Sequence, residues 1–350
     1  PDHAAQDRLQ AGHHHCNDWH TGLMGVFLKE DFWHDDFYKG IKVIYTIHNL
    51  KYQGIYPPSI MRDIIGLPQE LFDNGNLECD GCVNYMKSGL VYADRVTTVS
   101  PTYAQEITYP YFGEASGYIR ANSGKVSGIL NGLDVDATIR KRILTLKSSI
   151  LSHGPADKRE NKDALRKELG LRIQRGVPLI AMVTRLVEDK GLDLVMRIMD
   201  ELVDDEVQLV LVGTGDAGYE DAFRELAYRH PNKVSANIMF NEALAHKVYA
   251  ASDMFLMPSR YEPCGLSQLI ALRYGSIPIV RETGGLKDTA IFNKYSRQGN
   301  GLTFPNFNAH ELLFTMKRAL GYYEDDSVWD QLVHNAMTSD YSWNQSLTPI

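Results

Sequence analysis

The sequence predicts an α/β protein whose core is parallel β-sheet. Short, continuous apolar runs, such as "LIAMVT" at 179–184, alternate with longer segments of helical periodicity. Uninterrupted apolar strands are typical of parallel sheets that helices cover on both faces, because neither face meets water. Ligands of such sheets bind beyond the carboxyl ends of the strands, so the residues that follow each strand are the first candidates for a site.

The order of these segments predicts two Rossmann-like domains, the first of them incomplete. Apolar runs predict strands at 42–49, 94–100, 125–132, 178–186, 207–215, 253–259 and 276–280. Amphipathic patterns predict helices at 158–171, 191–203, 219–230, 243–252 and 266–275. We therefore expect an N-terminal domain over 1–135, an inter-domain region over 136–160, a C-terminal domain over 161–325 and a tail helix over 326–350.

Composition excludes several classes of protein. The 350 residues carry a formal charge of −8, whereas a nucleic-acid-binding chain usually has a basic excess. No apolar run reaches the length of about 18 residues that a membrane span needs. The N-terminus does not read as a signal peptide, and its first residue is not Met, so we expect a fragment. Four cysteines in a chain of this length favour a reducing cytoplasm over a disulfide scaffold.

Two short motifs have some metal-binding character, and we expect neither to hold a metal. Cys79 and Cys82 form a single C-x-x-C, but a structural zinc site needs a second pair of ligands and no matching pair follows in the sequence. We interpret them as ordinary loop thiols. The run 13–15 consists of three adjacent histidines, which are poorly spaced for a closed site.

Basic residues and glycines follow the strands of the second domain. Arg185 follows the apolar run "LIAMVT" at 179–184, and Lys190 directly precedes a predicted helix. Together with the helix amides, two cations of this kind suit a diphosphate. The pair Gly284 and Gly285 would let the backbone approach phosphate oxygens closely. The alternative is that the cations are solvated surface charges and the glycines only turn the chain.

Glu262 lies in a Pro/Gly loop between a predicted strand and a predicted helix. A carboxylate there either caps the helix or accepts hydrogen bonds from sugar hydroxyls and stabilises positive charge on an anomeric carbon. In the first domain, "NDWH" at 17–20 and His48 add groups that bind hydroxyls. A structural role for either histidine, His20 or His48, is equally compatible with the sequence.

These motifs resemble those of bacterial glycogen synthases and plant starch synthases. The resembling stretches run in family order: "CNDWHTGL" (16–23), "TIHNLKYQGIY" (46–56), "YADRVTTVSPTYAQEI" (92–107), "SGILNGLD" (127–134), "VTRLVEDKGLDLV" (183–195) and "SRYEPCGLSQLIALRYGSIPIVRETGGLKDT" (259–289). The resemblance implies a GT-B architecture, in which two Rossmann-like domains face a cleft. It also implies a retaining transferase that moves glucose from ADP-glucose to the non-reducing end of an α-1,4-glucan.

The resemblance further implies roles for individual residues. Arg185 and Lys190 match the pair that neutralises the leaving diphosphate, and Glu262 matches the group that grips the glucose hydroxyls. His48 matches the histidine beside the reacting face of the sugar. The remaining matches are substrate contacts: Asp18 and Asn131 in the glucose pocket, Cys264 and Gly265 beside Glu262, Thr283, Gly284 and Gly285 at the phosphates or sugar, and Phe240 stacking on adenine.

The same resemblance implies what the reaction does not need. The departing ADP oxygen would deprotonate the acceptor hydroxyl while Arg185 and Lys190 stabilise its charge, so no metal and no further cofactor is required. The paired-carboxylate route of retaining glycosidases needs a second acid about 5 Å away, and no partner for Glu262 is evident in the sequence. We expect a bacterial, cytoplasmic enzyme that binds neither nucleic acid nor membrane; its oligomeric state is open.

The N-terminal part departs from the family pattern. The chain has no K-x-G-G-L loop, and the stretch "AAQDRLQAGHHH" at 4–15 is a poor candidate for a central parallel strand. We therefore expect an exposed sheet edge and weak or absent catalysis by this chain alone.

Two alternatives stay open. One is another GT-B enzyme that uses a UDP-sugar, although many of these have a second Glu at the position of Ile270. The other is a non-catalytic remnant that binds nucleotide-sugar or glucan.

Overall fold

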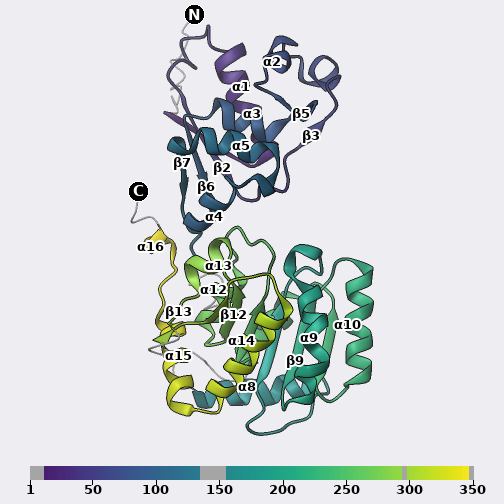
Figure 1. Ribbon diagram of the computed structural model, residues 1–350. Coiled ribbons are helices and arrows are strands. Elements are labelled where there is room, and N and C mark those ends of the chain that lie inside the picture. Colours follow the sequence, from purple (N-terminus) through teal and green to yellow (C-terminus); the bar gives the residue numbers. More distant parts are fainter. Residues whose placement is uncertain (1–11, 135–154, 294–297, 347–350) are drawn as a thin grey trace, which may run out of the picture. The chain divides into compact units, whose positions relative to one another are not determined.

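The computed structural model describes residues 12–134, 155–293 and 298–346, and shows two compact units (Figure 1). The units comprise Pro1–Leu130 and Asn131–Ile350. Each is built around parallel β-sheet, as the apolar runs predict. No helix in the parts of the chain that the structure describes has the length and apolar character needed to cross a bilayer.

The first unit contains a four-stranded parallel sheet of order β1-β2-β6-β7. Its strands are β1 (His13–Asn17), β2 (Lys42–Ile47), β6 (Arg95–Thr98) and β7 (Val126–Gly128). The connecting helices are α1 (Met24–Val26), α3 (Tyr85–Tyr92), α4 (Pro101–Glu106) and α5 (Glu114–Ala121). Tyr45 and Ile47, both completely buried, centre the core, and Gly89 of α3 leaves room for the Tyr45 ring.

A small antiparallel sheet of order β3-β5-β4 lies beside this unit's helices. Its strands are β3 (Ile55–Tyr56), β4 (Glu78–Cys79) and β5 (Cys82–Asn84), and α2 spans Glu70–Asp73. A two-residue turn, Asp80–Gly81, joins β4 to β5. Both turn residues have positive φ, 51° and 75°, as the type I′ hairpin turn requires.

The second unit contains a six-stranded parallel sheet of order β10-β9-β8-β11-β12-β15. Its strands are β8 (Leu179–Val183), β9 (Gln208–Gly213), β10 (Val234–Ile238), β11 (Met254–Met257), β12 (Ile277–Arg281) and β15 (Leu302–Phe304). Because β8 is the first strand of this unit along the chain, the order is the 3-2-1-4-5-6 arrangement of the Rossmann fold. The strand order reverses between β8 and β11, which opens a crevice at their carboxyl ends.

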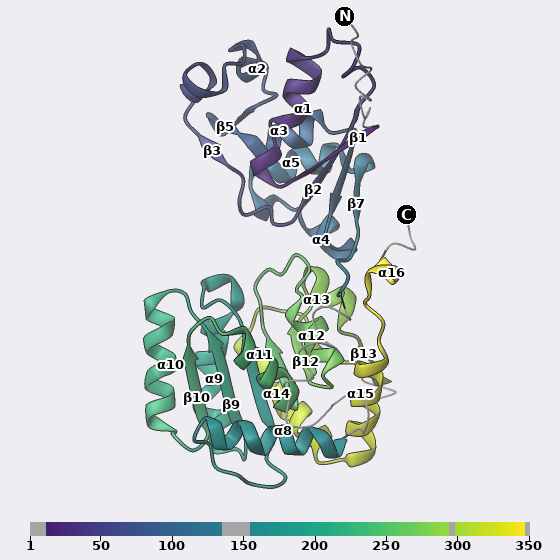
Figure 2. The ribbon, with the colours of Figure 1, turned by 180° about the vertical axis from the view of Figure 1, so that it is seen from behind.

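Helices cover both faces of this sheet, with α9 and α14 in front in Figure 1 and α8 and α11 in front in Figure 2. The helices are α8 (Pro155–Glu168), α9 (Leu192–Asp204), α10 (Ala217–Arg229), α11 (Glu242–Ala251), α12 (Ser267–Arg273), α13 (Gly284–Thr289), α14 (Ala309–Tyr323), α15 (Asp326–Thr338) and α16 (Trp343–Ser346). A short hairpin, β13 (Phe292–Asn293) with β14 (Gln298–Gly299), precedes β15.

The first and last described segments of the second unit are paired with each other. The backbone N–H of Leu133 donates to the Tyr341 carbonyl at 2.8 Å, and Leu133 forms a parallel bridge with Ser342. Gly132 lies so close to Trp343 that a Cβ atom added at Gly132 would meet the Trp343 backbone at 2.5 Å. The point where the chain enters this unit therefore lies beside its C-terminal segment.

The stretch at 4–15 was expected to make a poor central parallel strand, and the strand that includes its end is not central. His13–Asn17 pairs in parallel with Lys42–Thr46. Only Cys16 of this strand is buried. Within the described residues β1 pairs with β2 alone, so it is an edge strand, and an edge strand tolerates polar side chains that a central strand does not. Residues 4–11 lie outside the described part.

A cluster of two lysines and one aspartate is buried between α8 and the second unit's core. Asp253 accepts hydrogen bonds from Lys162 Nζ and from the backbone N–H of Leu179, each at 2.7 Å. Lys158 Nζ donates to the Tyr274 carbonyl at 2.8 Å. Burial lowers the pKa of Lys158 from its ordinary value to about 7, because the charged ammonium loses its hydration and Lys162 adds a second positive charge nearby.

We expect Lys158→Met to change how the stability depends on pH. Between about pH 7 and the ordinary lysine value near 10.5, Lys158 is neutral in the folded chain and protonated in the unfolded chain. Unfolding therefore takes up a proton, and the contribution of Lys158 to stability rises with pH across this window by up to about 1.4 kcal/mol per pH unit. Urea denaturation at several pH values between about 7 and 9.5 should show a shallower slope for the variant. Parallel curves for the two proteins would mean that Lys158 is charged when folded.

Candidate active site

Basic and acidic side chains converge where the strand order of the second unit reverses. Arg185 follows β8, and Lys190 ends a short 3-10 turn, Glu188–Lys190, that leads into α9. Glu262 lies in the loop that follows β11. Because β8 and β11 are neighbours in the sheet, the loops after them share the crevice of the switch point. The strand order thus places together residues that lie about seventy positions apart in the sequence.

Lys190 and Glu262 form an ion pair in this crevice. Lys190 Nζ lies 2.6 Å from Glu262 Oε2, and the two side chains are only 16% and 10% exposed. The Ser259 hydroxyl donates a second hydrogen bond to the same carboxylate oxygen at 3.1 Å. A partly desolvated pair of this kind needs both partners, because removing one leaves an uncompensated charge. Ser259 was not predicted as a site residue. The one sequence feature that could have indicated it is its position three residues before Glu262 in the same loop.

The loop after β12 packs directly on the backbone of the Glu262 loop. The backbone N–H of Gly285 donates to the carbonyls of Glu262 and Pro263 at 3.2 and 3.1 Å. A Cβ atom at Gly284 would meet the Glu262 carbonyl oxygen at 2.1 Å, and one at Gly285 would meet the Cys264 carbonyl oxygen at the same distance. Thr283 is buried and occupies the position before the first residue of α13. Both glycines are therefore required for close backbone contact, whether or not phosphate binds there.

Cys264 and Gly265 complete the Glu262 loop. Burial raises the pKa of the Cys264 thiol to about 11, so the group is a neutral thiol near pH 7 and not a nucleophile. The backbone N–H of Asn131 donates to its sulfur. Gly265 has a φ of 71°, and the Gln268 amide donates to the carbonyls of Cys264 and Gly265 at 3.0 and 2.9 Å. The loop is thus held by buried polar contacts on both sides.

A cavity of about 310 Å³ in the second unit contains Arg185 and Phe240 in its wall. It lies at the carboxyl ends of β8, β9 and β10, and its lining includes Gly213, Tyr249 and Ile270. Phe240 is 91% exposed, which is unusual for a phenylalanine in a globular protein. An apolar cavity with an exposed aromatic ring at its edge suits a flat heterocycle.

The first unit brings Asp18 and His48 together at the carboxyl ends of β1 and β2. Asp18 Oδ1 accepts a hydrogen bond from the His48 backbone N–H at 2.8 Å, and His48 Nε2 lies 2.9 Å from Asn17 Oδ1. Asp18 has a φ of 53°, a strained conformation for a residue other than glycine. Strain of this kind persists where the surrounding bonds hold it, and here the Asp18 backbone N–H also donates to Thr46.

The chain matches two family models, one in each half. Residues 4–120 match the starch synthase catalytic domain, and residues 162–331 match glycosyl transferases group 1. A glycogen synthase of Bacillus cereus (strain B4264) is 48% identical over 334 residues, which are 95% of this chain and 70% of that protein. The chain belongs to the glycogen synthase and starch synthase family.

Further comparisons agree with this assignment. A glycogen synthase of Clostridium botulinum (strain Alaska E43 / Type E3) is 51% identical over 335 residues, with the same coverage of 95% and 70%. The catalytic domain of starch synthase IV from Arabidopsis thaliana, bound to ADP and acarbose, superimposes with a TM-score of 0.86 at 33% identity, over 96% of this chain and 71% of that one. A sucrose-phosphate synthase from Thermosynechococcus elongatus, with a TM-score of 0.59 and 19% identity, shares the fold.

Membership of this family confirms the predicted GT-B fold and the predicted class of enzyme. The chain is a glycosyltransferase of glycogen or starch biosynthesis, with a nucleotide-sugar donor and a glucan acceptor. The roles of the individual residues stay predictions. The structure brings Lys190, Glu262, Cys264 and the Gly284 loop together in the second unit. It places Arg185 with Phe240 in the wall of a cavity of the same unit, and Asp18 beside His48 in the first unit.

We expect Gly284→Ala to destabilise the second unit strongly. The added methyl group would strike the Glu262 carbonyl, and Gly284 has a φ of 43°, which disfavours any side chain. The loss should be about 2 kcal/mol or more, since backbone strain alone costs about 1–3 kcal/mol.

Gly218→Ala in α10 is the matched control, because a Cβ atom there meets nothing within 4 Å. The Gly218→Ala variant should have an unchanged free energy of unfolding, or one raised by up to about 1 kcal/mol, because alanine has a higher helix propensity than glycine. Thermal or urea denaturation of both variants measures the difference, and an equal stability of the two would show that the Glu262 loop yields to the methyl group.

Proposed function

We propose that this chain transfers glucose from ADP-glucose to the non-reducing end of an α-1,4-glucan, with retention of configuration. The observation that carries the proposal is the Lys190–Glu262 ion pair at the switch point of a Rossmann sheet. Crevices of this kind bind nucleotides, and this one contains a cation for the diphosphate and an anion for the sugar within 2.6 Å of each other.

Lys190 and Arg185 would stabilise the departing diphosphate. Charge develops on the bridging oxygen as the glycosidic bond breaks, and fixed cations in a partly desolvated site stabilise that charge without reorganisation. Glu262 holds Lys190 in position through the 2.6 Å contact. Since the pair is formed before a donor arrives, the cation is already oriented toward the crevice when the phosphates bind.

Glu262 itself suits a binding role better than a nucleophilic one. Its Oε2 atom already accepts from Lys190 and Ser259, which spreads its negative charge. The carboxylate would accept hydrogen bonds from sugar hydroxyls and stabilise positive charge on the anomeric carbon. Retention then follows from a front-face route, in which the diphosphate oxygen removes the proton of the acceptor hydroxyl as the new bond forms.

Asp18, His48, Asn131, Cys264 and the amides of Thr283–Gly285 would complete the sugar and phosphate contacts. The Asp18 carboxylate accepts a hydrogen bond from the His48 backbone N–H at 2.8 Å, so the positions of the two residues depend on each other. A cytoplasmic location stays a prediction from the sparse cysteines.

Phe240 supports adenine as the donor base. Its exposed ring edges the cavity that also contains Arg185, so a base stacked on the ring would direct its phosphates toward the switch point. The similar starch synthase IV domain is described with ADP bound. The sequence analysis left a UDP-sugar donor open as an alternative. Such a donor would bind in the same place, with uracil, a smaller base than adenine, beside Phe240.

We expect Glu262→Gln to lower kcat for glucose transfer from ADP-glucose to glycogen by at least about 100-fold, the loss typical of a removed electrostatic contact in a transition state. The amide keeps the shape of the side chain but loses the charge that stabilises the anomeric centre, and Lys190 then lacks its counter-ion. Incorporation of labelled glucose into glycogen measures the effect.

Glu201→Gln on the exposed face of α9 is the control and should leave the rate unchanged, because Glu201 only approaches Lys317 at 3.8 Å. Transfer by Glu262→Gln within about threefold of the parent rate would overturn the role of Glu262. ADP binding without any transfer by the parent chain would favour the non-catalytic alternative and the expectation of weak catalysis.

We expect Phe240→Ala to raise KM for ADP-glucose about tenfold or more with little change in kcat, because base stacking on an aromatic ring contributes about 1–3 kcal/mol. Tyr228→Ala is a matched control, since Tyr228 is 82% exposed on α10 and lies outside the cavity lining. Kinetics with ADP-glucose and UDP-glucose in parallel distinguish the two donors. An unchanged KM for ADP-glucose in Phe240→Ala would contradict the proposal that Phe240 stacks on adenine.

A further inference from the structure

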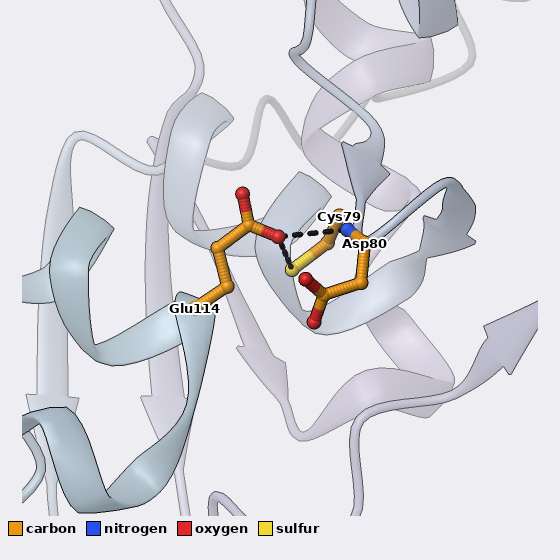
Figure 3. A group of neighbouring side chains, drawn as sticks. All are labelled: Cys79, Asp80 and Glu114. Atoms are coloured by element: carbon orange, nitrogen blue, oxygen red, sulfur yellow. Dashed lines mark hydrogen bonds between the residues drawn. The ribbon is translucent and has the colours of Figure 1, made fainter.

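One group of polar contacts outside the proposed site is structural, and another bears on the reaction. In the first unit, Glu114 Oε2 accepts hydrogen bonds from the Cys79 thiol at 3.3 Å and from the Asp80 backbone N–H at 2.7 Å (Figure 3). These bonds join the β4–β5 hairpin to the first turn of α5, which is a structural role. In the second unit, the contacts of Arg281 reach the loop that carries Glu262.

Arg281, the last residue of β12, holds the loop after β11 by its backbone. Its Nε donates to the Ser259 carbonyl at 2.9 Å, and its Nη2 donates to the Arg260 carbonyl. Its Nη1 lies 3.4 Å from the Pro305 carbonyl oxygen. The pairing of β11 with β12 ends at Met257, so the sheet does not hold the carbonyls beyond it. A planar guanidinium can bind two successive carbonyls because its donors form a rigid fork.

The two residues that this guanidinium binds each contact one side of the ion pair. The buried Ser259 hydroxyl donates to Glu262 Oε2 at 3.1 Å. The Arg260 backbone N–H donates to the Asp189 carbonyl at 2.8 Å, and Asp189 belongs to the turn that ends in the lysine of the pair. A shift of either carbonyl away from Arg281 would therefore move the carboxylate relative to the ammonium.

Other contacts hold the same loop from its remaining sides. A Cβ atom added at Gly191 would meet the Pro258 carbonyl oxygen at 2.1 Å, so the start of α9 rests directly on the loop backbone. The Arg260 guanidinium lies 4.0 Å from the centre of the Phe307 ring, which is a cation–π contact. With its side chain held there, Arg260 presents its carbonyl to Arg281 and its N–H to the turn before α9.

We propose that Arg281 is a positioning residue for glucose transfer, which places the Glu262 carboxylate and its lysine partner through two backbone carbonyls. The inference rests on the proposed function, in which this ion pair acts on the donor. A misplacement of about 1 Å in a reacting constellation can cost about 100-fold in rate, so an arginine that does not touch the substrate can still limit transfer.

The test compares Arg281→Lys with the parent chain, with Glu262→Gln and with the double variant. Lysine keeps the charge but lacks the planar fork that binds both carbonyls. We expect Arg281→Lys to lower kcat for transfer to glycogen about tenfold or more, with a smaller change in KM for ADP-glucose. If Arg281 acts through Glu262, the double variant should lose no more than about threefold beyond Glu262→Gln, far less than the product of the two losses.

Binding without an acceptor gives a second readout that does not depend on turnover. Calorimetric titration of Arg281→Lys should show a severalfold weaker affinity for ADP-glucose and an unchanged affinity for ADP, because ADP lacks the sugar that Glu262 would hold. Arg281→Gln, which keeps donors for one carbonyl, replaces Arg281→Lys if the lysine variant does not fold. Thermal denaturation establishes that each variant is folded.

Arg166→Lys is the matched control. The buried Arg166 guanidinium also binds two backbone carbonyls, those of Gln174 and Val177 at 3.0 and 2.7 Å, but it does so before β8, at the opposite end of the strand from Lys190. The control should lower the melting temperature and leave kcat and both affinities unchanged. This result would separate the positioning role of Arg281 from a contribution to stability alone.

The outcomes distinguish this inference from the proposed function. An unchanged kcat and an unchanged ADP-glucose affinity in folded Arg281→Lys, beside a large loss in Glu262→Gln, would overturn the role of Arg281 alone. Losses that multiply in the double variant would also overturn it, because Arg281 would then act independently of Glu262. No loss in Glu262→Gln would overturn the proposed function itself. If the parent chain binds ADP-glucose without transfer, the two affinities decide.

Discussion

The second unit is organised around one ion pair, Lys190 with Glu262, in a crevice that excludes most of the surrounding water. An isolated charge in such a place would be strongly destabilising, but each partner offsets the other. The pair also joins two loops that come from different halves of the sheet. Any movement of the loop after β8 relative to the loop after β11 would separate the charges, so the electrostatic contact and the backbone geometry support each other.

The backbone geometry in turn depends on two positions without side chains. Gly284 and Gly285 allow the loop after β12 to rest on the carbonyls of Glu262 and Cys264. Three consecutive strands, β8, β11 and β12, thus contribute loops to one small region, although they are separated by long helical segments in sequence. The polar groups of the site are positioned mainly by peptide groups, which have fewer degrees of freedom than side chains.

Much of the second unit was predictable from the sequence, and less of the first. The strands at β8, β9, β11 and β12 were found because they are buried on both faces and read as continuous apolar runs. β10, "VSANI", was not predicted, because Ser235 and Asn237 interrupt its apolar residues and all but the first residue of the strand are only half-buried. The order of the strands in the sheet could not be predicted either, since apolar periodicity indicates which residues are buried but not which strands are neighbours.

The candidate site, too, was only partly predictable from the sequence. The glycines and the charged residues after the strands were indicated by their position, and the resemblance to known synthases added their roles. The hydrogen bond from Ser259 to Glu262 was not indicated, because serine is common in loops and its contact with the carboxylate arises only when the loop folds back.

The pairing of Leu133 with the Tyr341–Ser342 segment has a consequence for modularity. A polypeptide that enters and leaves a unit at neighbouring points can be exchanged as a cassette, because joining it to another chain at that spot disturbs few internal contacts. The same closure makes the second unit a natural subject for circular permutation, with new ends in a surface loop and the old ends linked. The region around the Lys190–Glu262 ion pair would be unchanged by such a rearrangement, since every strand that forms it lies between the two paired segments.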